Sequence, residues 1–206
     1  MKKILLLSFL FLNFQASWAD SGGFLGIDHK LPLDNSGIWS RDNQKAVELG
    51  SAGLLVLGAL YEGSESKLGK TYWQSIDAMV SADLTAALAK SVFKRQRPID
   101  GNNPNAFYNN PNDKSFPSGE VTHITAIVTP FILNFKDENS MVWGLAALPA
   151  YVGMARLKSQ AHWQTDVLAG LALGSGMGYL ASNRSNPWSL ALLPSGVSVG
   201  FKKNFN

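Results

Sequence analysis

The chain has 206 residues, of which 46% are hydrophobic and 16% charged, so intrinsic disorder is excluded and the length favours one domain. Because it has no cysteine, disulfide scaffolds, thiolate metal sites and cysteine nucleophiles are excluded, and with only three histidines a zinc site is a poor first hypothesis. Once Lys2 and Lys3 of the N-terminal segment are set aside, 16 basic residues stand against 15 acidic ones. So small a net charge gives no support to a nucleic-acid partner.

The N-terminus has the features of an export signal. A basic start precedes a mostly apolar run over residues 4–14, which is too short to span a bilayer comfortably. Ser17 and Ala19 place small residues where a signal peptidase reads them, although an uncleaved anchor is the alternative. We therefore expect a signal peptide over 1–19, a single domain over 20–206, and a bacterial periplasmic or envelope protein, soluble or membrane-associated.

Hydrophobic periodicity predicts an all-α helical bundle of about five or more helices. The helices are expected at about 42–61, 67–94, 118–135, 141–157 and 162–182. Asp42 is the expected cap of the first, and the long Asn-rich loop 99–116 has a length that is typical of functional or disordered loops. Alternating apolar residues over 190–201 predict a small C-terminal β-hairpin. None of the segments gives a clean apolar run of about 20 residues, which favours a soluble or membrane-surface bundle over an integral one.

Three clusters carry residues suited to chemistry. In the first, six residues separate Lys90 from Arg97, so on one continuous helix both cations would leave the same face. Pro98 then ends the helix, and two aligned cations before a long loop can bind an anion together. The structural alternative is a solvated basic helix end that also includes Lys94 and Arg95, since cations are favoured at helix C-termini.

The second cluster, residues 115–120, is typical of a helix start. Ser118 or Ser115 can cap the helix, and Gly119 lets a ligand approach the backbone closely. Free amides at such a terminus bind phosphate-like anions, although this cluster taken alone is better explained as a simple N-cap.

The third cluster joins Arg156, His162 and Asp166. Asp166 lies four residues beyond His162, one turn along an expected helix, where a carboxylate can accept a hydrogen bond from one imidazole nitrogen. That bond would fix the tautomer and leave the other nitrogen as a nucleophile. A structural ion pair at the start of the helix is the alternative.

Taken together, the clusters resemble the signature of the type 2 phosphatidic acid phosphatase (PAP2) superfamily, which includes bacterial class A acid phosphatases and vanadium haloperoxidases. The K-x-x-x-x-x-x-R-P part matches at Lys90, Arg97 and Pro98. The P-S-G-H part matches at 117–119 but has Glu120 where the histidine is expected.

The third part of the signature, S-R-x-x-x-x-x-H-x-x-x-D, matches at Arg156, His162 and Asp166, with Ala155 in place of serine. The resemblance implies a PAP2-like helical bundle and hydrolysis of a phosphomonoester without a metal or other cofactor. His162 would attack phosphorus and form a phosphohistidine, and Asp166 would orient it. The phosphoryl oxygens would be held by Lys90, Arg97, Ser118, Gly119 and Arg156.

The departure at position 120 leaves the proton donor open. In the family the missing histidine is the expected donor to the leaving alkoxide. Glu120 could donate if burial raised its pKa, His123 could reach the site from three residues further on, or no residue donates and turnover is slow.

The resulting expectation is an exported phosphatase that acts on a phosphorylated lipid or a small phosphomonoester, with a membrane surface as a further possible partner. A vanadium-dependent haloperoxidase and a catalytically degenerate phosphate-binding protein are the competing hypotheses.

Overall fold

The computed structural model describes residues 22–23, 25–183, 188–193 and 196–201. The expected signal peptide, 1–19, lies outside the described residues.

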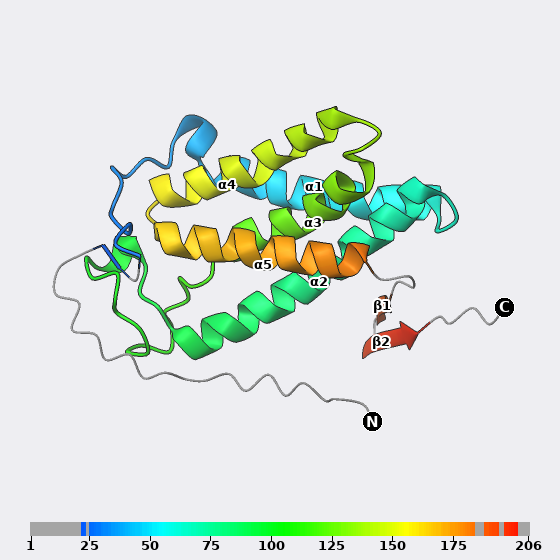
Figure 1. The fold of residues 1–206 in the computed structure, drawn as a ribbon. Coiled ribbons are helices and arrows are strands. Elements are labelled where there is room, and N and C mark those ends of the chain that lie inside the picture. The colour runs from blue at the N-terminus through cyan, green and yellow to red at the C-terminus, as the bar shows by residue number, and fades with distance from the viewer. Residues whose placement is uncertain (1–21, 24, 184–187, 194–195, 202–206) are drawn as a thin grey trace, which may run out of the picture.

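Within the described residues, five α-helices follow one another (Figure 1): α1 (Arg41–Glu62), α2 (Lys67–Phe93), α3 (Gly119–Phe135), α4 (Ala147–Lys158) and α5 (Gln164–Ser182). Three short 3-10 helices connect them: η1 (Gly37–Trp39), η2 (Pro98–Asp100) and η3 (Ser140–Ala146). The predicted all-α bundle is confirmed. No helix among the described residues combines the length and the apolar character needed to cross a membrane.

Two antiparallel strands, β1 (Trp188–Leu193) and β2 (Gly196–Phe201), follow the bundle, with Trp188 opposite Phe201. They lie in the segment where the sequence predicts a small β-hairpin. Residues 194–195, between the strands, lie outside the described residues.

Helix α3 is the centre of the bundle and packs most extensively against α5 and α2. It contributes Val121, Ile124 and other buried apolar residues to the core. Close packing with α5 depends on glycine, because a Cβ added at Gly174 would lie 2.5 Å from the carbonyl oxygen of Thr122. Side chains along this face of α5 would therefore force the two helices apart.

Several helix ends differ from the sequence predictions. Helix α1 is capped by Ser40, whose hydroxyl accepts a hydrogen bond from the Asn43 amide at 3.3 Å, and Asp42 lies in its first turn instead. The predicted helix 141–157 divides into η3 and α4, and α5 begins at Gln164, so His162 lies before the helix.

One end of the bundle collects the segments that form the site. The segment 25–36 before η1, which we call the N-terminal arm, and the loop between α2 and α3 lie at the same end (Figure 1). Backbone hydrogen bonds join them to the helices: the Asp34 amide donates to the Lys158 carbonyl at 2.9 Å, and the Ser118 amide donates to the Asp166 carbonyl at 3.0 Å. The starts of α3 and α5 are thereby held next to each other.

Candidate active site

His162 is fully buried immediately before α5. Its Nδ1 lies 2.7 Å from the backbone carbonyl oxygen of Ser115. Since a carbonyl only accepts, Nδ1 carries the proton of that hydrogen bond, and in the neutral ring Nε2 then has the free lone pair. The predicted orientation of a nucleophilic nitrogen is present, with a different partner from the one expected.

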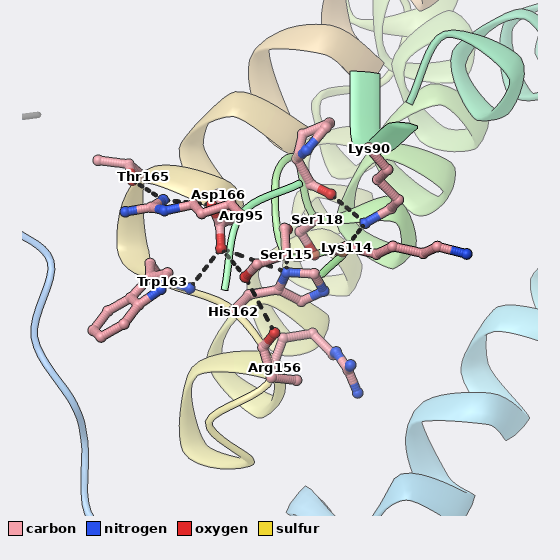
Figure 2. A network of polar contacts seen from close by, with 12 residues as sticks. Lys90, Arg95, Lys114, Ser115, Ser118, Arg156, His162, Trp163, Thr165 and Asp166 are labelled. Atoms are coloured by element: carbon pink, nitrogen blue, oxygen red, sulfur yellow. Dashed lines mark hydrogen bonds and ion pairs between the residues drawn. The ribbon is translucent and has the colours of Figure 1, made fainter. Parts of the chain in front are cut away.

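Asp166 does not make the direct hydrogen bond that the sequence predicts, because α5 begins at Gln164 and the two residues do not share a helix face. Its Oδ2 lies 3.7 Å from His162 Nδ1 and instead accepts hydrogen bonds from the Ser115 hydroxyl at 2.5 Å and the Trp163 amide at 2.8 Å. Figure 2 shows Ser115 between the carboxylate and the imidazole. Asp166 therefore orients His162 largely through Ser115.

The Asp166 carboxyl is held in its charged form. Burial raises its pKa, but His162, Arg95 and Ser115 outweigh that effect and lower the pKa below its ordinary value.

Arg95, which the structural alternative for the first cluster assigned to a solvated helix end, is almost completely buried. Its guanidinium donates to Asp166 Oδ1 at 2.5 Å, to Asp28 Oδ2 at 2.6 Å and to Thr165 Oγ1 at 2.7 Å. Asp28 in turn accepts from the Thr165 amide at 2.8 Å. We call Asp28, Arg95, Ser115, Thr165 and Asp166 the anchoring network.

Ser115 and Asp166 belong to the predicted clusters, but the pairing of Asp28 with Arg95 has no signal in the sequence. Asp28 lies in a glycine-rich arm far from Arg95 along the chain, and no spacing rule relates the two. The only available signal is that a buried arginine needs acidic partners, which presupposes knowing that it is buried.

Lys90 reaches from the last turn of α2 over the start of α3. Its Nζ donates to the carbonyl oxygens of Lys114 at 2.9 Å and Pro117 at 2.5 Å. Burial lowers its pKa to about 8, although Glu120 opposes that shift. Lys90 is thus fixed by two neutral acceptors, and its charge is available to an anion.

Arg97 does not share a helix face with Lys90, because α2 ends at Phe93 and Lys94 adopts a left-handed conformation with φ 44°. Both cations nevertheless line the same cavity of about 270 Å³. Its walls are formed by Glu48, Asp83, Ala86, Ala87, Lys90, Arg97, Gly119, Glu120 and His123.

Arg156 is buried on α4 and donates through Nη1 to Gln44 Oε1 at 2.9 Å. Its Nη2 lies 3.5 Å from Glu120 Oε1. Burial lowers the pKa of Arg156 to about 10, so the guanidinium stays charged at neutral pH. Arg156 belongs to the same cluster of charges as the cavity residue Glu120.

Glu120 lies among cations. Its Oε1 is 3.1 Å from Arg41 Nη2, and its Oε2 is 3.4 Å from His162 Nε2. Burial raises the pKa of Glu120, but the His162 ring and Arg156 outweigh burial and lower it far below its ordinary value. A carboxyl in this state has no proton to donate, which speaks against the interpretation of Glu120 as general acid. Arg41, missed by the sequence reasoning, has no motif that would identify it.

His123 is paired with a carboxylate. Its Nδ1 lies 2.8 Å from Asp83 Oδ2. Burial lowers its pKa, but Asp83, together with Glu48 and Glu120, raises it above its ordinary value. His123 therefore favours the protonated form that a general acid needs.

Unpartnered polar atoms gather at the predicted site. Among the described residues, five buried side-chain polar atoms have no hydrogen-bond partner. Four belong to predicted site residues: Ser118 Oγ, His123 Nε2, Arg156 Nε and His162 Nε2. Such groups are costly to bury, and their concentration in one place is typical of a ligand site.

The PAP2 superfamily model matches residues 71–188 of the chain, a span that includes Lys90 to Asp166. Among solved structures, the crystal structure of Aquifex aeolicus LpxE is similar, with a TM-score of 0.47 and 16% sequence identity, over 72% of this chain and 98% of that chain. No curated protein matches.

Proposed function

Because this chain belongs to the PAP2 superfamily, we propose that it is an exported, metal-independent phosphatase that hydrolyses a phosphomonoester through a phosphohistidine at His162. The family match supports a phosphatase of the PAP2 type, and the export, the substrate and the steps are our proposal. The observation that carries it is the group of unpartnered atoms on Ser118, His123, Arg156 and His162, which can accept or donate to a phosphoryl group and its leaving oxygen.

In the first step, His162 Nε2 attacks phosphorus and the bond from phosphorus to the ester oxygen breaks. The phosphoryl oxygens are held by Lys90, Arg97, Arg156, the Ser118 hydroxyl and the Gly119 amide. The positive charge that develops on the imidazole is stabilised by Asp166, through Ser115. Phosphoryl transfer depends mainly on positioning and charge stabilisation, which these residues provide.

The leaving alkoxide needs a proton, and His123 is the proposed donor. Its Nδ1 is bound to Asp83, its Nε2 has no partner, and its raised pKa favours the protonated ring. In the second step His123 takes a proton from water, and the resulting hydroxide attacks the phosphohistidine. Phosphate leaves, and both histidines return to their starting states.

A phosphorylated lipid at a membrane surface is the proposed setting. Helix α1 begins beside the site and has no charged residue from Leu49 to Tyr61. Its exposed apolar side chains include Leu49, Leu54, Leu57, Leu60 and Tyr61. An exposed apolar face of this kind is typical of membrane or partner contact. Co-sedimentation with phosphatidylglycerol vesicles, compared between the wild type and Leu57→Ser/Leu60→Ser, tests this part.

The decisive experiment measures phosphate release by the purified mature protein, in excess chelator, from a panel of lipid and soluble phosphomonoesters. We expect turnover of at least one substrate, inhibition by vanadate, and an acid-labile phosphoprotein in single-turnover reactions. Activity that requires an added divalent metal would contradict the mechanism. Bromide oxidation with vanadate and peroxide, without phosphate release, would instead identify a haloperoxidase.

A further inference from the structure

The Glu120 carboxylate lies where the substrate's phosphoryl group is expected. One oxygen is 3.4 Å from His162 Nε2, and the other is 3.1 Å from Arg41 Nη2 and 3.5 Å from Arg156 Nη2. Reacting atoms in a productive complex are typically about 3–3.5 Å apart, so this carboxylate occupies the distance at which phosphorus would face the nucleophile.

We propose that Glu120 is a built-in anion, which pairs with Arg156 and Arg41 beside the nucleophile in the free protein and which the substrate's phosphoryl group must displace. The proposal rests on the proposed function, since it concerns the same site. Two observations give the carboxylate room to move: its side chain is only partly buried, at 17% exposure, and it lines the cavity.

Charge balance explains why an internal anion is useful. Arg41 and Arg97 both disfavour the charged form of Arg156, whereas Glu120 and, to a smaller extent, Glu48 favour it. Without a nearby anion, Arg41 and Arg97 would repel the buried Arg156 in the free protein. A carboxylate and a phosphoryl group a few ångströms apart would also repel each other strongly at low dielectric, so the two cannot share the cations.

Displacement also frees the nucleophile. His162 Nδ1 faces the Ser115 carbonyl and Nε2 faces a Glu120 oxygen, so both nitrogens have acceptors in front of them. A lone pair on Nε2 pointing at a carboxylate oxygen is unfavourable, and attack on phosphorus requires that lone pair. Removing the carboxylate from this position therefore prepares Nε2 for attack.

The Glu120 carboxylate also determines how much negative charge a ligand needs in order to displace it. A phosphomonoester dianion brings more charge to Arg41 and Arg156 than the single charge of Glu120, whereas a phosphodiester monoanion brings no more. Glu120 is thus a specificity-determining residue that favours monoesters over diesters.

The test is isothermal titration of inorganic phosphate into the wild type, Glu120→Gln and Glu48→Gln, in chelator at neutral pH. Glu48 lines the same cavity, and among the described residues no ion pair to its carboxylate is found, so it controls for a general loss of negative charge. We expect Glu120→Gln to bind phosphate roughly tenfold more tightly or better, on the scale of close charge pairs, and Glu48→Gln to change affinity only slightly.

Equal or weaker phosphate binding by Glu120→Gln, or the same gain in Glu48→Gln, would overturn the proposal while leaving the proposed phosphatase intact. If the wild type and both variants all fail to bind phosphate, the proposed function fails with it. Should Glu120→Gln not fold, Glu120→Asp keeps the charge but withdraws it from His162. Its phosphate affinity should exceed that of the wild type, and an unchanged affinity would count against the proposal.

Discussion

The two sides of His162 differ in how completely their polar groups are paired. On the Nδ1 side, the anchoring network is buried and its carboxylates each have several donors. On the Nε2 side, the cavity residue His123 and the predicted site residues Ser118 and Arg156 have buried polar atoms without partners. Fully paired polar groups stabilise the position of His162, whereas unpaired polar groups are available to bind a ligand. Substitutions on the first side should therefore mainly affect stability, and substitutions on the second side should mainly affect activity.

The largest effect on activity is expected from His162→Ala. Removing the nucleophile should lower kcat by several orders of magnitude, because the proposed mechanism uses His162 Nε2 to attack phosphorus. Phosphate release and thermal unfolding measured on the same preparation test this, with His29→Ala in the exposed arm as control. A folded variant with near-normal turnover would show that His162 is not the nucleophile.

On the anchoring side, Arg95→Gln should mainly affect stability. It leaves the carboxylates of Asp28 and Asp166 buried without their cation, and breaking a buried ion pair in this way costs about 3–5 kcal/mol. Denaturant unfolding should show that loss, whereas Lys114→Gln, which removes an exposed cation in the same loop, should change stability by less than about 0.5 kcal/mol. Equal stabilities would mean that the network does not hold the site.

Much of the site was accessible from the sequence because its residues sit in short motifs with fixed spacing. Lys90, Arg97 and His123 do line one cavity, and Arg156 and His162 contact Glu120 beside it. The helices were also predictable, since periodic apolar residues specify which face is buried.

The remainder depends on contacts between distant segments. The hydrogen-bond partner of His162 is a backbone carbonyl, which cannot be predicted from residue types. Whether Asp166 could be the partner depends on where α5 begins, and the observed start differs from the prediction by only a few residues. The lowered pKa of Glu120 depends on the His162 ring and on Arg156, two groups far from it in sequence. Charge state follows from the sum of such neighbours and cannot be read from a motif.

On the cavity side, His123→Ala should slow the hydrolysis of alkyl phosphates by about 10²-fold or more and that of p-nitrophenyl phosphate far less, because only the poor leaving group needs a proton. The same selectivity in Glu120→Gln, and not in His123→Ala, would return the donor role to Glu120.

The pH dependence of His123 has a defined sign. Its pKa is raised in the folded protein. The stabilising pair with Asp83 is therefore fully present below the unfolded pKa of about 6.5 and is lost as the pH rises through the folded pKa. Alkyl phosphate turnover should fall over that same upper range, and the fall should be absent from the residual activity of His123→Ala. If the fall persists in His123→Ala, deprotonation of His123 is not the cause of the loss of turnover at high pH.

The smallest effect is expected at Lys90, whose pKa burial lowers to about 8. Because the neutral amine cannot attract an anion, affinity for a tetrahedral dianion should weaken as the pH rises above 8, by at most about tenfold per pH unit. Sulfate is the suitable probe, since it does not titrate in this range. Lys90→Arg keeps its charge to much higher pH, and His123 is unchanged in both proteins, so the difference between the two inhibition profiles reports Lys90 alone. The profiles should diverge from pH 8 upward. If they stay parallel up to pH 9.5, the ammonium of Lys90 is held by its carbonyl acceptors and does not contribute its charge to the anion.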